Sequence, residues 1–525
     1  MLAAETMCFP ATTTTETAGS RAKKRGATGS CPSAGRTTRT STCTSEMEMG
    51  SSASDEMTNY ARHTRRDFLC RTAALGIVGT AGRWIPPARA QQSETATLHA
   101  KPGTARLAPA DYPETPVWGY DGKVPGPTIR VPQGATVSRR FLNGLPQGST
   151  VHWHGVRLEN PMDGVPELTQ PVVEPADDFL YDFTVPDTGT YWYHPHERAW
   201  EQMARGLYGA LVVEEPEPPQ VDRDEVLLID DWRLAQDASI DESFGALGDW
   251  SHGGRTGNWI TVNGEAGWSL RVGQYERLRL RLVNVANARI FSLAANGLDG
   301  WLVALDGQPL GEARPAGPIV LAPGQRADIL IDAVAEPGSQ AVLYSRERES
   351  SFVLATFTVE GTARNERLPA PTALASNPVP PHGSLAEARR ATLHMEGGAM
   401  GGMREARMGG RMVPMRELAQ AGKLWAFNGD VEMSEKPLFA AERGEAWLVR
   451  IVNDTAWPHA MHLHGHHFRP VGSDGNAGPL RDTLLVDSEQ TVQIGFVADN
   501  PGDWLLHCHT LEHSIAGMRT WFRVT

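Results

Sequence analysis

The chain has 525 residues, enough for two to four domains, and its 53 glycines and 37 prolines indicate many turns between short elements. The formal charge is -13, although residues 1–90 hold 12 Lys/Arg against 7 Asp/Glu, so the remainder is more acidic still. An acidic chain repels phosphate groups, which argues against a nucleic-acid partner.

The first 90 residues are interpreted as a leader and not as part of a fold. The stretch Thr64–Leu69 reads TRRDFL, a twin-arginine pattern, and an apolar run over residues 73–81 follows it. Ala88-Arg89-Ala90 resembles an A-x-A cleavage site, so we expect Gln91 to begin the mature protein. These features predict export by the twin-arginine machinery to the periplasm.

Two alternatives concern the same region. A single membrane anchor is disfavoured because the apolar run over residues 73–81 is far shorter than the ~20 residues that span a bilayer. Residues 1–56 are rich in Ser, Thr and Gly, so they are expected to be disordered, or to be untranslated if Met57 is the true start.

A single cysteine remains after the leader. The chain has five, and Cys508 is the only one that follows Gln91. One cysteine cannot form an internal disulfide in an exported chain, so this thiol is either a buried bystander or a functional ligand. Its neighbours His507 and His509 favour a ligand.

The first and last parts of the mature chain repeat each other. Two sets of residues have identical spacing in both parts and lead into His pairs: Gly134, Asn143 and His152 match Gly444, Asn453 and His462, while Phe183, Gly189, His194 and His196 match Phe496, Gly502, His507 and His509. These parts are predicted to be duplicated domains.

The middle part has a similar strand but lacks the His pairs. Residues 277–282 alternate between arginine and leucine, which predicts a strand. The acidic, Pro-rich stretch at 214–219 and the Pro-rich stretch at 368–383 mark boundaries. The prediction is therefore a leader over 1–90 and β-domains over 91–219, 220–367 and 368–525, the middle one without metal ligands.

Four His-x-His pairs carry the chemistry. On a strand, residues two apart point to the same face, so each pair presents two imidazoles together. One pair alone has an ordinary explanation as a core or surface contact, but four at duplicated positions predict a multinuclear copper cluster between first and last domains. The pairs are His152/His154, His194/His196, His462/His464 and His507/His509.

A second site follows from strand parity. Cys508 faces away from His507 and His509, and His459, three residues before His462, also faces the opposite side. Thiolate, imidazole and thioether are the ligands of a blue-copper electron-transfer centre. Cys508, His459, His513 and Met518 are therefore predicted to form a mononuclear site that is joined to the cluster through residues 507–509.

The motifs HWHG, YHPH, HAMHLHG and HCHTLEHSIAGM resemble those of the multicopper oxidase family, over roughly residues 105–525. The resemblance implies an all-β fold of three cupredoxin-like Greek-key sandwiches. It also implies four copper ions and four one-electron oxidations of a reductant coupled to reduction of dioxygen to two waters. Type 1 copper would be held by His459, Cys508, His513 and Met518, type 2 by His152 and His462, and the type 3 pair by His154, His194, His196, His464, His507 and His509.

Two acidic residues also match the family. Asp163 in MDGVP and Glu512 in the copper-ligand loop resemble the acids beside the trinuclear cluster. Reducing dioxygen to water consumes protons, so a carboxyl group near a buried cluster can relay them. The alternatives are a turn-forming Asp-Gly for Asp163 and a solvated loop charge for Glu512.

The sequence departs from the family pattern near the type 1 site. Pro458 precedes His459, and Ala460 stands where the family usually has proline. Bacterial cuprous oxidases often carry Asp four residues and Met two residues before that histidine, whereas this chain has Thr455 and Trp457. The difference weakens the case for a cuprous oxidase. We expect Trp457 to lie beside His459 and contact an aromatic reductant.

A Met-rich run supports the opposite interpretation. Thioethers suit Cu(I), but a flexible Gly-rich surface loop with Met as a filler explains the run equally well. The residues are His394, Met395, Met400, Met403, Met408, Met412 and Met415.

The resemblance leaves the reductant open among phenolic or other aromatic compounds, Cu(I), with a role in copper tolerance, and Mn(II). A copper-binding protein without oxidase activity would be expected to lack some ligands, and a copper nitrite reductase would lack the full set of His pairs. We expect a monomer.

Overall fold

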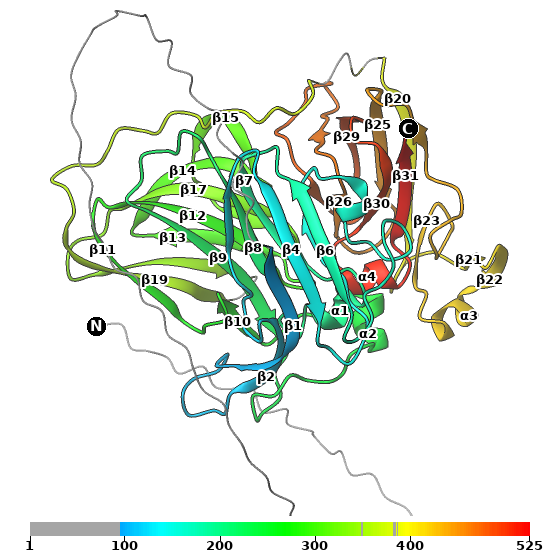
Figure 1. The fold of residues 1–525 in the computed structure, drawn as a ribbon, viewed down its shortest axis with the longest axis horizontal. Helices are drawn as coiled ribbons and strands as arrows, with labels where there is room; N and C mark the ends of the chain where they lie inside the picture. The colour runs from blue at the N-terminus through cyan, green and yellow to red at the C-terminus, as the bar shows by residue number, and fades with distance from the viewer. Residues whose placement is uncertain (1–94, 348–349, 382–384, 386) are drawn as a thin grey trace, which may run out of the picture. The chain divides into compact units, whose positions relative to one another are not determined.

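The computed structural model describes residues 95–525 except 348–349, 382–384 and 386 (Figure 1). The twin-arginine pattern at 64–69 and the cleavage site at 88–90 lie outside the described residues. Within the described part of the chain, no helix is long and apolar enough to cross a membrane.

The first sandwich contains two four-stranded sheets, in the orders β2-β1-β4-β6 and β3-β8-β7-β5. Its elements are β1 (Ala96–Ala105), β2 (Thr115–Tyr120), β3 (Ile129–Pro132), β4 (Thr136–Asn143), β5 (His152–His154), the 3-10 helix η1 (Asn160–Met162), β6 (Asp178–Thr184), β7 (Gly189–His194), α1 (Ala199–Gln202) and β8 (Gly209–Glu214).

The middle sandwich pairs a six-stranded sheet, β10-β9-β12-β17-β14-β15, with a five-stranded sheet, β11-β19-β18-β13-β16. Its elements are β9 (Arg223–Trp232), α2 (Leu247–Ser251), β10 (Trp259–Val262), β11 (Trp268–Gln274), β12 (Arg277–Asn284), β13 (Phe291–Asn296), β14 (Leu298–Leu305), β15 (Gln308–Pro315), β16 (Ile319–Leu321), β17 (Arg326–Ala333), β18 (Gln340–Arg346) and β19 (Ser351–Thr362). The predicted strand over 277–282 lies within β12.

The last sandwich has two five-stranded sheets, β23-β20-β25-β29-β27 and β24-β31-β30-β26-β28, with a β21-β22 hairpin. Its elements are β20 (Arg389–Gly397), β21 (Glu405–Met408), β22 (Arg411–Pro414), α3 (Met415–Gln420), β23 (Trp425–Phe427), β24 (Ala440–Ala441), β25 (Ala446–Asn453), β26 (His459–Leu463), β27 (Arg469–Pro470), β28 (Thr483–Val486), β29 (Thr491–Val497), β30 (Gly502–Cys508), α4 (Leu511–Ile515) and β31 (Arg519–Val524). The predicted all-β fold with three sandwiches is confirmed.

An asparagine repeats in all three sandwiches and explains the spacing found in the sequence. Asn143, Asn284 and Asn453 each end the strand before the His pair or its counterpart. Each amide nitrogen donates to main-chain carbonyls across the following loop, and each amide oxygen accepts the N–H of the residue two positions on. The same kind of hydrogen bonds therefore holds this loop in all three sandwiches, although the loop spans one more residue in the middle one.

Strand β7 shows why the site strands are buried on both faces. Tyr191 and Tyr193 point into the core of the first sandwich, whereas Trp192, on the opposite face, packs with Leu228 and Val283 of the middle sandwich. All six residues of β7 are buried. The outer face of this sheet is thus covered by a neighbouring domain, and residues such as His194 lie at a domain junction.

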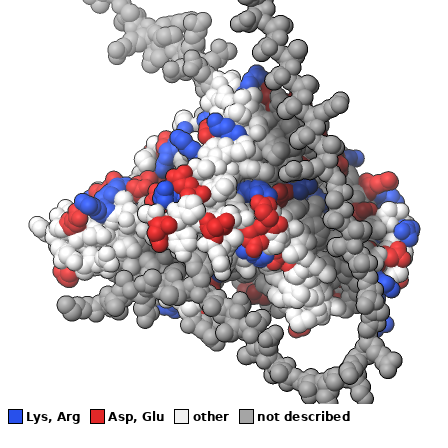
Figure 2. All heavy atoms as spheres, turned by 90° about the horizontal axis from the view of Figure 1, so that it is seen from below, with Lys and Arg blue, Asp and Glu red and all other residues white. Residues whose placement is uncertain are grey.

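Acidic and basic side chains are interspersed over the face of the molecule shown in Figure 2. A nucleic-acid site is recognised by a concentration of positive charge, whereas positive and negative side chains are mixed on this face.

Candidate metal centres

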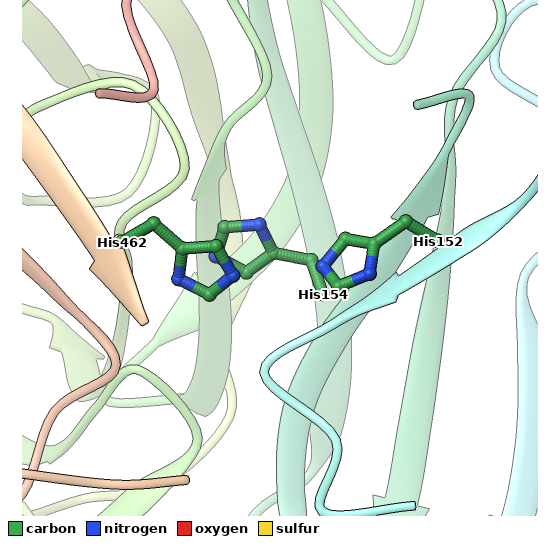
Figure 3. Close-up of side chains that lie close together, drawn as sticks. All are labelled: His152, His154 and His462. Carbon is green, nitrogen blue, oxygen red and sulfur yellow. The ribbon is translucent and has the colours of Figure 1, made fainter. Parts of the chain in front are cut away.

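The four His-x-His pairs come together between the first and last sandwiches. Strand pairing places His152 opposite His194 in the first and His462 opposite His507 in the last. Rings from the two domains then stack across the junction, with centroids 3.7 Å apart for His154 and His462. Figure 3 shows the rings of His152, His154 and His462 turned toward one another. All eight imidazoles are buried.

The ring nitrogens fall into groups of three whose ligand atoms lie within 4.8 Å of one another. The groups are His152, His154 and His462; His154, His194 and His509; and His196, His464 and His507. Imidazole is a good ligand for copper, and three sets of three are the arrangement that a multinuclear site requires.

The hydrogen bonds of these histidines leave one nitrogen free on each of several rings. The Nδ1 atoms of His152 and His462 donate to main-chain carbonyls of Asp163 and Asp482, at 2.8 Å and 2.9 Å. A neutral imidazole with Nδ1–H has its lone pair on Nε2. On the eight cluster histidines, the buried nitrogens without a partner among the described residues are Nε2 of His152, His194, His462, His464 and His507, Nδ1 of His154 and both nitrogens of His509.

A buried nitrogen without a hydrogen-bond partner costs free energy, and a metal ion bound between several such nitrogens would remove that cost. Burial lowers the pKa of His464 and His509 well below the ordinary value, and the neighbouring imidazoles lower it further. The rings are therefore neutral, which is the state that binds a metal. The residues present fit the copper ions that the sequence motifs imply.

Asp163 directly contacts two of the cluster histidines. Its Oδ2 lies 2.8 Å from Nδ1 of His464, and its Oδ1 lies 3.2 Å from Nδ1 of His152. Gly164 follows it with a φ of +82°, and a Cβ there would lie 1.9 Å from the Val151 carbonyl oxygen. The Asp-Gly turn therefore packs against the strand that leads to the first His pair, and the carboxylate orients ligands from both domains.

Glu512 lies in α4, and in the sequence it stands between His509 of the cluster and His513 of the mononuclear site. Its Oε1 accepts a hydrogen bond of 3.0 Å from Nδ2 of Asn287, a middle-domain residue. Its Oε2 is buried without a partner in the described part of the chain. Burial raises the pKa of Glu512. This carboxyl group is thus not a solvated loop charge, because it is enclosed and able to hold a proton.

Asp482 also contacts the cluster, although no sequence motif predicted it. Its Oδ1 lies 3.2 Å from Nε2 of His154, and both of its oxygens are held at 2.7 Å by the guanidinium of Arg326. Burial by itself raises the pKa of Asp482, but Arg326 outweighs it and holds the pKa well below the ordinary value. The available signal was weak: a charged Arg481-Asp482 pair directly before the apolar strand β28.

The residues predicted for the mononuclear site also lie together. The Sγ of Cys508 is 3.6 Å from Nδ1 of His459 and 3.9 Å from Nδ1 of His513. Met518 is fully buried in the same core cluster as Cys508. Burial raises the pKa of the Cys508 thiol to about 12, so a thiolate here needs a bound cation to replace the proton.

The outer nitrogens of the two imidazoles are both occupied. Nε2 of His459 lies 2.8 Å from Oγ1 of Thr455, and Nε2 of His513 donates to the main-chain carbonyl of His252, which follows α2 of the middle domain. Each ring therefore directs Nδ1 toward Cys508. The indole of Trp425 packs against both rings, at centroid distances of 5.1 Å and 4.3 Å.

Trp457 forms part of the cover of this site. Its indole N–H donates to the carbonyl of Ala399, and its ring lies 5.3 Å from the ring of His252. The side chain is partly buried. It therefore packs between His252 of the middle domain and Ala399 of the last, and it is partly exposed.

The Met-rich run has more structure than a flexible loop. Residues 405–408 and 411–414 pair as the β21-β22 hairpin, and α3 follows. Met395 is in the core of the last sandwich, while Met403, Met408 and Met415 pack against a small apolar cluster. Only Met400 and Met412 are largely exposed among these methionines. The interpretation as a flexible loop is wrong, and the sulfur atoms are divided among three environments.

A cavity of about 480 Å³ reaches the eight-histidine cluster. His194, His196 and His507 form part of its wall, together with Trp200 and Lys423. Three cluster imidazoles are thus in contact with space that small molecules such as water and dioxygen can occupy.

Comparisons with known proteins agree with this geometry. Family models described as multicopper oxidase match residues 103–218, 223–359 and 412–525. The multicopper oxidase MmcO of Mycobacterium tuberculosis is 28% identical over 510 residues, which cover 87% of this chain and 96% of that protein. Copper resistance protein A of Pseudomonas syringae pv. tomato is 29% identical over 328 residues, 53% of each chain.

Solved structures show the same relationship. Lac15 from a marine microbial metagenome is 38% identical, with a TM-score of 0.67, over 82% of this chain and 100% of that one. A multi-copper oxidase from Pseudomonas Thermotolerans is 31% identical, with a TM-score of 0.71, over 82% of this chain and 98% of that one. Together with the four His pairs and the Cys508 site, these matches show that the chain belongs to the multicopper oxidase family, whose members are copper-dependent oxidoreductases that use dioxygen.

Proposed function

We propose that this multicopper oxidase oxidises small aromatic reductants, such as phenols, by one electron at a time and reduces dioxygen to two waters. The assignment that underlies the proposal places type 1 copper on His459, Cys508, His513 and Met518. Type 2 copper is assigned to His152 and His462, and the type 3 pair to His154, His194, His196, His464, His507 and His509. The groups of neighbouring ring nitrogens have the same membership, with His154 close to both centres.

Copper supplies the one-electron redox chemistry that no side chain of this chain provides. The chain contributes the connection between centres, because Cys508 is bonded through the backbone to His507 and His509. His462 and Cys508 also lie on neighbouring strands, β26 and β30, which pair in register. The short covalent path and the buried surroundings keep the two centres at one separation and exclude bulk water.

The carboxyl groups are proposed to handle protons. Glu512, with its raised pKa and its unpartnered buried oxygen, can hold a proton for delivery during dioxygen reduction. Asp163 orients His152 and His464 and can accept or donate a proton at the oxygen that faces His152. Both roles use atoms of this chain that the geometry leaves available.

The surface over the type 1 site is the observation that favours an aromatic reductant. Met400 and Leu247 are 78% and 59% exposed. They lie in the two segments that meet where the Ser251 carbonyl accepts the N–H of Ala399. The rings of Trp457 and His252 lie next to this contact. A planar apolar molecule can pack against such a rim, whereas a hydrated cation gains little from it.

Turnover of Trp457→Ala with a phenol and with ferrocyanide tests the proposal. Loss of one ring contact, worth ~0.5–1.5 kcal/mol, predicts a fall of about 2- to 10-fold in kcat/KM for the phenol. Ferrocyanide, which needs no ring contact, should be oxidised normally. Trp268→Ala, a change in the middle sandwich, is the matched control. Equal phenol kinetics in Trp457→Ala and the unaltered protein would remove the aromatic rim from the substrate site.

A second candidate reductant is Cu(I), with a role in copper tolerance. Two thioethers, those of Met400 and Met412, are exposed, and relatives are named copper resistance proteins. Replacing both with leucine keeps the apolar surface and removes the sulfur. A selective fall in Cu(I) oxidation, with phenol oxidation unchanged, would favour this candidate. Mn(II) is a third reductant to include in the same comparison.

The copper content separates an oxidase from a copper-binding protein without activity. Four copper ions per chain with dioxygen-dependent turnover support the oxidase, and failure to consume dioxygen with any reductant contradicts it.

Export to the periplasm is proposed on the TRRDFL pattern at residues 64–69. Replacing Arg65 and Arg66 with lysine should retain the protein in the cytoplasm. Size-exclusion chromatography of the unaltered protein tests the expectation of a monomer.

A further inference from the structure

A turn of the copper-free middle domain forms part of the wall of the eight-histidine cluster. It lies between β16 and β17 and contains Gly324 and Gln325. A Cβ added to Gly324 would lie 2.9 Å from Cε1 of His154 and 3.0 Å from Cδ2 of His509. Nε2 of Gln325 donates to the carbonyl of Thr483, next to Asp482, at 3.0 Å. The middle domain is therefore in contact with the cluster and does not only separate its neighbours.

Arg326, the first residue of β17, extends this contact into the last domain. Its two terminal nitrogens bind the two oxygens of Asp482 at 2.7 Å each, and its Nε donates to the Thr190 carbonyl of the first domain at 3.1 Å. Both members of the pair have no exposed surface. A forked guanidinium that binds a carboxylate at two points fixes its plane as well as its position.

Asp482 in turn contacts two cluster histidines from different domains. Its Oδ1 lies 3.2 Å from Nε2 of His154, and its main-chain oxygen accepts Nδ1–H of His462 at 2.9 Å. Next to a carboxylate, Nε2 of His154 carries the hydrogen, so Nδ1 keeps the lone pair. That Nδ1 is one of the buried nitrogens without a partner in the described residues.

His154 therefore differs from its neighbours in the nitrogen that it leaves free. His152, His194, His462, His464 and His507 are all bonded through Nδ1 and have a free Nε2. His154 is bonded through Nε2 and has a free Nδ1. Nε2 of His154 lies 3.2 Å from Oδ1 of Asp482 and 3.2 Å from Oγ1 of Thr483, whose hydroxyl donates to the same Oδ1 at 2.8 Å. Both contacts depend on the position of the Asp482 carboxylate, which Arg326 holds.

Gly155, the glycine of the first His-x-His-Gly motif, leaves space for the ion pair between Arg326 and Asp482. Gly155 has a φ of +84°, and a Cβ there would lie 2.3 Å from a terminal nitrogen of Arg326 and 2.4 Å from Oδ2 of Asp482. The ion pair thus packs directly against the chain that carries His154, and neither partner can shift without displacing that segment.

We propose that Arg326 is a positioning residue for the copper cluster: through Asp482 it holds His154 and His462 in the tautomers and orientations that bind copper. The middle domain thereby controls the affinity of a site to which it contributes no ligand. This inference goes beyond the proposed reductant, because it concerns copper binding and is tested without any substrate.

The test compares Arg326→Lys with Arg277→Lys in the full copper-loaded protein. Lysine keeps the positive charge but loses the two-point fork. Arg277 is the matched control, since it is also buried in the middle domain and also binds one aspartate, Asp332, through two nitrogens, at 2.7 Å and 2.9 Å. Copper content is measured during dialysis against a chelator, with the type 2 electron paramagnetic resonance signal and the type 1 visible absorption.

Loss of a group that orients a metal ligand typically costs about 10- to 100-fold in metal affinity. Arg326→Lys should release cluster copper at a correspondingly lower chelator concentration, with an altered type 2 signal and an unchanged type 1 absorption. Arg277→Lys should behave like the unaltered protein. Arg326→Gln, which removes the charge as well, should lose more cluster copper and still show the type 1 absorption.

Two results would overturn the proposal. One is an unaltered type 2 signal with unaltered copper retention in Arg326→Lys. The other is an equal loss in Arg277→Lys, since this would mean that any damaged ion pair in the middle domain has the same effect. If the unaltered protein binds its copper but does not oxidise phenols, the proposed reductant is wrong, and the copper-retention test of Arg326 is unaffected.

Discussion

The first and last sandwiches differ from the middle one in the strand that follows the repeated asparagine. Nine residues after the repeated asparagine, the first sandwich has His152 and the last has His462, each paired with a histidine on the next strand. In the middle sandwich that strand is β13, which has no histidine, and its Leu293 packs in the sandwich core. In β5 it is Trp153 that packs in the core, so His152 faces the opposite way.

The difference shows that the metal ligands are separable from the fold. The middle sandwich keeps the asparagine at 284 and its hydrogen bonds, and it has a core of its own. Beside Leu293 it has an apolar cavity of about 210 Å³, lined also by Ala295 and Ile319. Burial of apolar side chains is therefore sufficient for the sandwich, and the imidazoles of the other two serve copper.

The largest expected effect follows from removing the residue that connects the two centres. Cys508→Ser should abolish the intense blue absorption and the oxidation of every reductant, because the thiolate is the strongest ligand of the type 1 site. The type 2 signal should persist, since its assigned ligands, His152 and His462, are on other strands, β5 and β26. Visible absorption and copper content check the result. A retained blue band would remove Cys508 from the site.

Removal of a histidine from the cluster gives the next largest effect. His152→Leu should remove type 2 copper and reduce turnover to background, while the sandwich stays folded, because the imidazole faces away from the apolar core that includes Trp153. Circular dichroism, copper content and the type 2 signal provide the measurement.

Leu293→His, in the core of the middle sandwich, is the control. It places an imidazole among apolar side chains without partners, so it should add no copper and cost about 1–3 kcal/mol of stability. A gain of bound copper there would show that one histidine is enough to recruit metal to this fold.

Glu512→Gln is expected to slow reoxidation of the reduced enzyme by dioxygen by about 100-fold or more, the usual contribution of a proton-transferring group. The amide keeps the hydrogen bond with Asn287 but cannot deliver a proton. Stopped-flow reduction of type 1 copper should be unchanged, as should reoxidation in the control Glu435→Gln. Normal reoxidation at all pH values would limit Glu512 to a structural role.

The smallest effect on turnover is expected from a buried acid in the middle domain. Asp230, in β9, is buried; burial and then the neighbouring Asp231 raise its pKa well above the ordinary value. Its contribution to stability is therefore complete below the pKa of about 3.9 in the unfolded chain and is lost as the pH rises through the raised value.

In Asp230→Asn the side chain stays neutral at every pH, so the stability is not lost as the pH rises. The amide oxygen still accepts the N–H of Asp231. The variant should be more stable than the unaltered protein by about 1–3 kcal/mol at pH 7 and nearly equal to it at pH 3 to 4, with unchanged turnover. Thermal unfolding across this range is the measurement. A difference that does not vary with pH would show that the carboxyl group is not the cause.

The side chains that share a face of a strand could be predicted from the amino-acid order alone. His507 and His509 on one side and Cys508 on the other follow from the two-residue period of a strand, and the same parity separates His459 from His462. The duplicated spacing of asparagine and histidine predicted two matching sandwiches, because the loop that follows each asparagine is a local structure. These inferences need only the geometry of neighbouring residues.

The contacts between residues of different domains could not be predicted in this way and depend on the packing of the folded chain. Arg326 and Asp482 are 156 positions apart and have no repeating pattern, so nothing local indicates that they pair beside His154. The same holds for the His252 carbonyl on His513 and for the division of the Met-rich run between core and surface. The physical reason is that these contacts depend on how three separately formed sandwiches pack, and buried charge is placed by its partner across the junction, which periodicity within one strand does not specify.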